Sequence, residues 1–138
     1  MSPSTETLRV WVTSWPQQCC GAPFAVGGDV EWELYEQNDD AWMLDVMGAY
    51  PDAFPTHNED HHSGVVDAPR TRGLVSRIRV VHCDFAPRAQ ELAGMYPVPG
   101  TSALVDVPRA DGREAETSTR MFVGYLVDLV VDPTPKGT

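Results

Sequence analysis

The sequence predicts a small, mainly β protein: a bent antiparallel sheet or partly closed barrel of SH3 or OB size, with one short helix and long loops. Five segments read as strands, and the first two of them alternate apolar and polar residues with the period of two that half-buried strands show. Twelve prolines and 11 glycines among 138 residues favour turns and short elements over long helices. A chain of this length fits one domain and can bury a core.

The first two predicted strands lie on either side of a turn that carries two adjacent cysteines. Residues 8–15 (LRVWVTSW) alternate in polarity and form the first strand. Residues 25–36 (AVGGDVEWELYE) contain a Gly-Gly turn followed by the second strand. Between them, Pro16, Gly21 and Pro23 interrupt regular structure. The residues expected to share one face are Leu8, Val10 and Val12 in the first strand, and Val30, Trp32 and Leu34 in the second.

The predicted helix covers residues 41–50 (AWMLDVMGAY). Asn and Asp residues suited to helix caps precede it, and Gly48 with Pro51 ends it. Residues 51–64 (PDAFPTHNEDHHSG) are polar and rich in turn formers, and they are predicted to form a loop.

Three further strands are predicted in the second half of the chain, at residues 73–85, 102–107 and 120–131. Residues 86–101 between them read as a loop with a short helical turn at 89–93. Glycines at four positions are expected to mark bends or bulges; they are Gly27, Gly28, Gly73 and Gly124. Alternation in the long strand places Leu74, Ser76, Ile78, Val80 and His82 on one face, and Val75, Arg77, Arg79, Val81 and Cys83 on the other.

The predicted domain covers residues 8–131, with a flexible N-terminus at 1–7 and a flexible tail at 132–138. No apolar run approaches the ~18 residues of a membrane span, and the N-terminus lacks the features of a signal peptide. Three cysteines, two of them adjacent, fit a reducing compartment. We therefore expect a cytoplasmic protein that is not bound to a membrane.

The net charge of −10 argues against binding to nucleic acid or to an anionic membrane. The charge is also unevenly distributed: residues 10–69 contain eleven acidic residues and no Lys or Arg, and five arginines follow within twenty residues. We favour the interpretation that Glu31 and Glu33 pair with Arg77 and Arg79 across adjacent strands. The alternative is an acidic lobe beside a basic strip that orients a partner.

The adjacent Cys19 and Cys20 are candidate nucleophiles, but a reactive thiolate needs a base and a lowered pKa. His61, His62 and Glu59 are the candidate partners in such a site. No cysteine-protease signature surrounds the cysteines, and packing as small apolar residues is the favoured interpretation.

A metal site is the second possibility for the histidine-rich segment, with His57, His61 and His62 as candidate ligands. Adjacent residues on a strand point in opposite directions, so the two cysteines make a poor ligand pair. His82 shares a face with apolar residues and is expected to lie in the core. We therefore favour a solvated loop at His57–His62 and predict no metal or cofactor.

Exposed aromatic residues are the third candidate feature. Trp11 shares a face with Arg9 and Thr13 and is expected to be exposed, as part of a binding surface with Trp15. Met95 and Tyr96 lie in a proline-stiffened loop that is either a ligand lid or a hydrophobic plug. The predicted binding residues are Trp11, Trp15, Met95, Tyr96, Arg77 and Arg79.

The run W11-x3-W15-x-Q17-Q18-C19-C20-G21-x-P23-F24 resembles the opening of an uncharacterised actinobacterial family that carries only a label of unknown function. Further similarity covers HHSG (61–64), YPVPG (96–100) and FVGYLVDL (122–129), and thus most of residues 8–130. The resemblance implies a small single-domain protein and supplies no catalytic residue. Pro16 stands where the family is expected to carry a polar residue.

Taken together, these features predict a non-enzymatic binding or accessory protein that engages a protein partner or a small molecule. The resemblance implies a setting in actinobacterial specialised metabolism. The alternatives are an enzyme or a metal-binding protein built on the same residues, Cys19, Cys20, His61 and His62.

Overall fold

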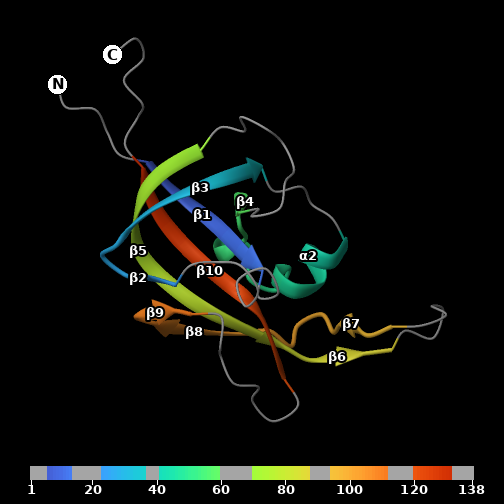
Figure 1. Ribbon diagram of the computed structural model, residues 1–138. Coiled ribbons are helices and arrows are strands. Elements are labelled where there is room, and N and C mark those ends of the chain that lie inside the picture. The colour runs from blue at the N-terminus through green and yellow to red at the C-terminus, as the bar shows by residue number, and fades with distance from the viewer. Residues whose placement is uncertain are drawn as a thin grey trace, which may run out of the picture.

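The computed structural model describes residues 6–13, 23–36, 41–59, 70–87, 94–111 and 120–131. Their fold is mainly β, with one α-helix and one 3-10 helix (Figure 1). The elements are β1 (Glu6–Thr13), β2 (Phe24–Ala25), β3 (Asp29–Glu36), α2 (Ala41–Met47), the 3-10 helix η1 (Pro51–Ala53), β4 (His57–Glu59), β5 (Arg70–Cys83), β6 (Phe85–Ala86), β7 (Tyr96–Pro97), β8 (Ala103–Val107), β9 (Arg109–Ala110) and β10 (Met121–Val131).

Five strands form a closed ring in the order β10-β1-β4-β3-β5, because β5 also pairs with β10. The β1–β4 pairing is parallel, and the other pairings in the ring are antiparallel. The strand β8 extends this sheet beyond the ring by pairing with β5. Two short ribbons, β2–β9 and β6–β7, complete the strand pairings in the described residues. The prediction of a small, partly closed β barrel is confirmed.

The long strand β5 closes the barrel because different parts of it pair with different neighbours. Residues 70–74 pair with β3, and residues 74–83 pair with β10. Residues 78–82 pair with β8 on the opposite side from β10. A single bent strand therefore joins both sides of the ring, as Figure 1 shows.

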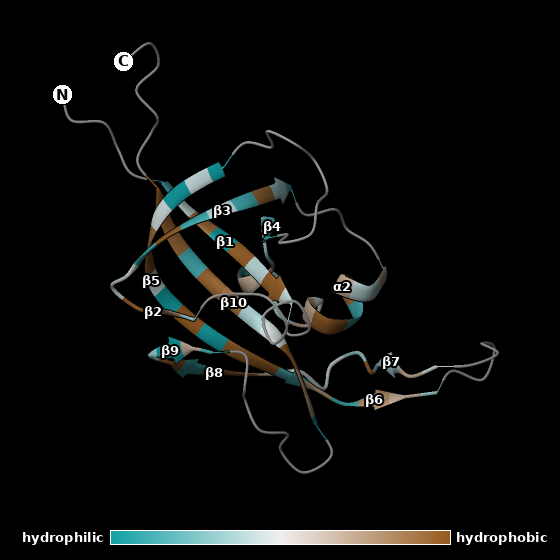
Figure 2. Cartoon of the chain, in the orientation of Figure 1, coloured by the Kyte–Doolittle hydropathy of each residue, from teal (hydrophilic) through white to brown (hydrophobic). Residues whose placement is uncertain are grey.

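The barrel interior is filled by the inward residues of every long strand, which appear as alternating apolar bands in Figure 2. Aromatic rings meet edge to face at its centre, with centroid distances of 5.0 Å for Phe24–Trp32 and 5.1 Å for Phe122–Tyr125. Trp32 is buried, as its alternation with two glutamates predicts. The residues that form this core are Val10, Val12, Phe24, Trp32, Val75, Ile78, Val80, Ala110, Phe122, Tyr125, Val127, Leu129 and Val131.

A second core lies on the outer face of the barrel, under α2. Trp11 is only 2% exposed there, and its ring meets that of Trp42 at a centroid distance of 5.9 Å. The expectation that Trp11 is exposed is therefore wrong: β1 is buried on both faces because the helix covers the outer one. The buried members of this core are Trp11, Met43, Val46, Met47, Ala53, Val81, Cys83, Val123 and Leu126.

A bulge changes the predicted faces of β5. Arg77 pairs with Asp128 and Val75 pairs with Leu129, so Ser76 is the extra residue on β5. Val75 consequently points into the barrel with Ile78, whereas Leu74 is exposed. The sequence places Leu74, not Val75, on the same face as Ile78. The structure exchanges the two residues, because one extra residue in the strand shifts the alternation.

The predicted loop at 51–64 contains two elements that its polar composition hides. Pro51–Ala53 forms η1, and His57–Glu59 forms β4 between β1 and β3. A strand of three polar residues is too short to show a period of two. The helix ends at Met47, three residues before its predicted end. The helical turn predicted at 89–93 lies outside the described residues.

No helix in the described part of the chain is long and apolar enough to cross a membrane.

Candidate binding surface

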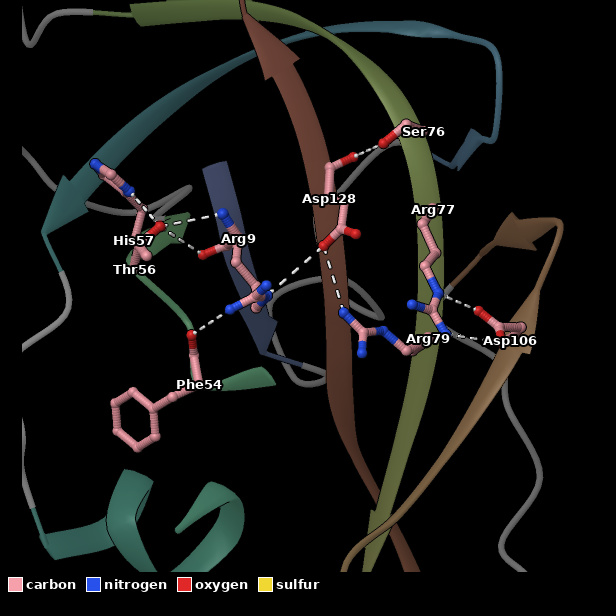
Figure 3. Close-up of polar contacts among 9 residues, drawn as sticks. All are labelled: Arg9, Phe54, Thr56, His57, Ser76, Arg77, Arg79, Asp106 and Asp128. Carbon is pink, nitrogen blue, oxygen red and sulfur yellow. Dashed lines mark hydrogen bonds and ion pairs between the residues drawn. The ribbon is translucent and has the colours of Figure 1, made fainter. Parts of the chain in front are cut away.

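A row of five charged residues crosses the outer face of the barrel above the second core (Figure 3). We call this row the polar ladder. The register places Arg9 on β1 beside Asp128 on β10, and Asp128 beside Arg77 on β5. Arg79, two residues further along β5, lies opposite Asp106 on β8. The ladder thus connects four consecutive strands of the sheet.

The contacts within the polar ladder differ in strength. Arg77 donates two hydrogen bonds to Asp106, from Nε to Oδ1 at 2.7 Å and from Nη2 to Oδ2 at 3.2 Å. Asp128 instead forms ion pairs with two arginines. Arg79 Nη2 lies 3.4 Å from its Oδ1, and Arg9 Nε lies 3.9 Å from the same atom. Arg9 also donates from Nη1 to the carbonyl of Phe54 at 3.2 Å. The bidentate pair with Asp106 is the tightest contact of the row.

Arg77 and Arg79, the two β5 arginines of the polar ladder, differ in burial. The Arg79 side chain is 11% exposed, and its pKa is lowered chiefly by burial and next by repulsion from Arg77. The hydrogen bond to Asp106 raises the pKa of Arg77, and the same bond lowers the pKa of Asp106. Among the described residues, the buried Nε atoms of Arg9 and Arg79 have no hydrogen-bond partner.

The bulge at Ser76 positions this part of the ladder. Its Oγ donates to the backbone carbonyl of Asp128 at 3.2 Å, which holds the bulged residue against β10. After the bulge, Arg77 and Arg79 both face outward while Ile78 faces the core. The sequence places these arginines on one face, and the structure brings them next to Asp128 and Asp106.

The predicted pairing of Glu31 and Glu33 with these arginines is wrong. Glu31 lies opposite Arg72, and Glu33 lies opposite Arg70. The reason is the division of β5: β3 pairs only with its first residues, before the strand bends away toward β8 and β10.

The ladder ends at β8, which is the last strand in the sheet order. Within the described residues, β5 is its only strand partner. Both ends of β8 are anchored. Ser102 Oγ donates to the Val46 carbonyl at 2.5 Å and the Tyr50 hydroxyl donates to the Ser102 carbonyl at 2.7 Å, while Val26 N–H donates to the Pro108 carbonyl at 3.0 Å.

The side chains of β8 are open to solvent at its centre. Val105 is 56% exposed although it lies opposite the buried Val80, and the Asp106 side chain is 64% exposed. Among the described residues, this edge is therefore an anchored strand with an exposed valine and an exposed carboxylate.

Several predicted site residues lie outside the described part of the chain: Trp15, Cys19, Cys20, His61 and His62. Of the remaining candidates, His57 and Glu59 lie on β4, opposite Glu36 and Leu34 of β3. His57 Nδ1 is 2.9 Å from Thr56 Oγ1. The described residues contain no group of three or more His, Cys, Asp or Glu placed to hold a metal ion. The enzyme and metal-site hypotheses stay predictions.

Tyr96 begins β7 of the β6–β7 ribbon, which extends from the C-terminal end of β5, and Met95 directly precedes it (Figure 1). Met95 is exposed, and Tyr96 is half-buried on β7 opposite Ala86. His82 is buried next to Phe122, as predicted for a core histidine.

Sequence reasoning did not select Arg9, Asp106 or Asp128. Each is a charged residue at an outward position of a predicted strand, with apolar neighbours on both sides. That pattern identifies the outer face, but it does not give the cross-strand register that brings the three residues into one row.

The fold defines the class as a small closed β barrel with an appended edge strand. The chain belongs to a family of unknown function, DUF6578, whose model matches residues 6–131. No curated protein matches the chain, and no solved structure matches it. The resemblance to an uncharacterised family is thus confirmed at the level of the family, while an actinobacterial origin stays a prediction.

Proposed function

We propose that the protein is a non-enzymatic binding or accessory protein that engages a protein partner, and that an extended segment of the partner adds to β8. The observation that carries this proposal is that β8 ends the sheet of an otherwise closed ring in the described residues. Strand addition to an exposed sheet edge is a common mode of peptide recognition. The setting in actinobacterial specialised metabolism implied by the resemblance makes an enzyme of such a pathway the candidate partner.

Backbone geometry supports this mode of binding. In an antiparallel pair, alternate residues direct their N–H and C=O groups toward the neighbouring strand, and the others direct theirs away from it. In the five residues of β8, at least two therefore present backbone groups on the side away from β5. Such groups form a template for a further strand.

Two further observations favour β8 as a binding edge. The hydrogen bonds at Ser102 and Pro108 hold both ends of the strand, so binding costs little additional ordering of this segment. Covering the exposed Val105 side chain would contribute on the order of 1 kcal/mol to association.

Site-specific photo-crosslinking in the source cells tests the proposal. A photoreactive residue at Val105 is expected to capture one stoichiometric protein, and the same residue at the exposed Leu74, outside the part of β5 that pairs with β8, is the matched control. The purified complex is expected to protect alternate β8 amides from hydrogen exchange. Equal capture at both positions, or unchanged exchange in β8, would contradict strand addition.

A further inference from the structure

The polar ladder alternates in sign from strand to strand. Arg9 on β1 is followed by Asp128 on β10, Arg77 on β5 and Asp106 on β8. Opposite charges on neighbouring strands stabilise a sheet, and like charges placed directly opposite each other destabilise it. The row ends with the carboxylate of Asp106 on β8, the strand that ends the sheet in the described residues.

Asp106 has room for a second cation. A carboxylate offers about four lone-pair sites, and the bidentate contact with Arg77 uses one on each oxygen. The Asp106 side chain is 64% exposed, so the remaining sites are open to solvent beyond β8. A strand added next to β8 would place a side chain beside this carboxylate.

The net charge of the whole chain also favours a cationic partner. A net charge of −10 attracts cationic segments over distance and repels acidic ones. It also repels a second copy of the chain. The sequence of β8, ALVDV, contains no basic residue, so no register of two β8 strands would supply a cation to Asp106.

We infer that the segment that adds to β8 is basic, with a Lys or Arg placed next to Asp106. This inference rests on the proposed strand addition and names the chemistry of the partner. The recognition pattern is an extended backbone paired with β8, an apolar side chain over Val105 and a cation on Asp106.

Three synthetic peptides of about seven residues provide the test. They share an alternating Thr/Val sequence and differ only at the central residue, which is Lys, Gln or Glu. Binding to the full chain is measured by NMR through the β8 amides. The Lys peptide is expected to bind about three- to fivefold more tightly than the Gln peptide, and the Glu peptide more weakly than both.

Variants of the full chain separate recognition from general charge. Asp106→Asn is expected to remove the preference for the Lys peptide, whereas the control Asp52→Asn, which changes the net charge equally at an exposed site, keeps it. Arg77→Gln is expected to increase the preference, because it removes the cation that now occupies Asp106.

The outcomes distinguish the two proposals. Equal binding of all three peptides at the β8 amides would overturn the basic partner and leave strand addition standing. If no peptide shifts the β8 amides, strand addition itself fails. If Asp106→Asn makes the protein self-associate while wild type shows no peptide preference, Asp106 only guards the edge against aggregation, and the inference is overturned.

Discussion

Arg77 and Arg79 are two residues apart on one face of β5, yet their surroundings shift their pKa values in opposite directions. Arg77 is half-exposed and holds Asp106 with two hydrogen bonds, which are charge-assisted and screened by solvent. Arg79 is largely buried and shares Asp128 with Arg9. The two carboxylates of the ladder therefore differ in their surroundings. Asp128 neutralises a buried cation, whereas Asp106 pairs with a half-exposed cation at the surface.

Asp128→Asn is expected to lower the free energy of unfolding by about 2–3 kcal/mol, because it removes the carboxylate in direct contact with the buried Arg79 and leaves that cation beside Arg9. Asp106→Asn should change stability far less, because both members of its ion pair are solvated. Urea denaturation of both variants measures the difference. Equal midpoints would contradict the distinction, and Asp128→Asn combined with Arg79→Met should recover part of the loss.

At the scale of elements, β1 and β10 approach closely where the indole ring of Trp11 packs against Gly124. A Cβ atom at position 124 would lie 2.6 Å from the Val12 carbonyl oxygen and 2.8 Å from Cζ2 of Trp11. The register shift between Phe122 and Gly124 lies at the same place. The glycine therefore allows one strand pair to carry a large indole on its outer face and a packed core on its inner face.

Gly124→Ala is expected to destabilise the protein by about 1–3 kcal/mol, the range for overpacking a tight core, because backbone and indole both block the added methyl group. Gly28→Ala is the matched control, since its Cβ would meet only the Ala25 carbonyl oxygen at 3.2 Å. Thermal unfolding followed by the tryptophan fluorescence measures both. An equal loss in the two variants would show that general glycine replacement, rather than the crossing with Trp11, accounts for the effect.

At the scale of the whole molecule, the pattern of apolar residues predicted the strands β1, β3, β5, β8 and β10 because each has a core-facing side. It did not predict which strand closes the ring, because β4 has only three residues, all polar. It also misplaced Trp11, since alternation cannot show that a helix covers the outer face. For the candidate surface, the sequence supplied Arg77 and Arg79 but not their partners, whose identity follows from the registers of β5 with β10 and β8.

The short strand β4 closes the ring between β1 and β3. This strand contacts β1 through the pairs Val10–His57 and Trp11–Asn58, and it contacts β3 on its other side. A proline in a strand paired on both sides removes a ladder hydrogen bond. Asn58→Pro is therefore expected to open the ring locally, because β5 and β10 retain their longer pairing with each other.

Hydrogen exchange measured residue by residue tests this expectation. In Asn58→Pro, protection should fall at Trp11 and at those β3 residues among 34–36 whose amides point toward β4. It should persist at the β5–β10 pair, and Asn58→Ala should resemble wild type. A uniform loss of protection across all strands would contradict local opening, because it would mean that the barrel folds only as a closed ring.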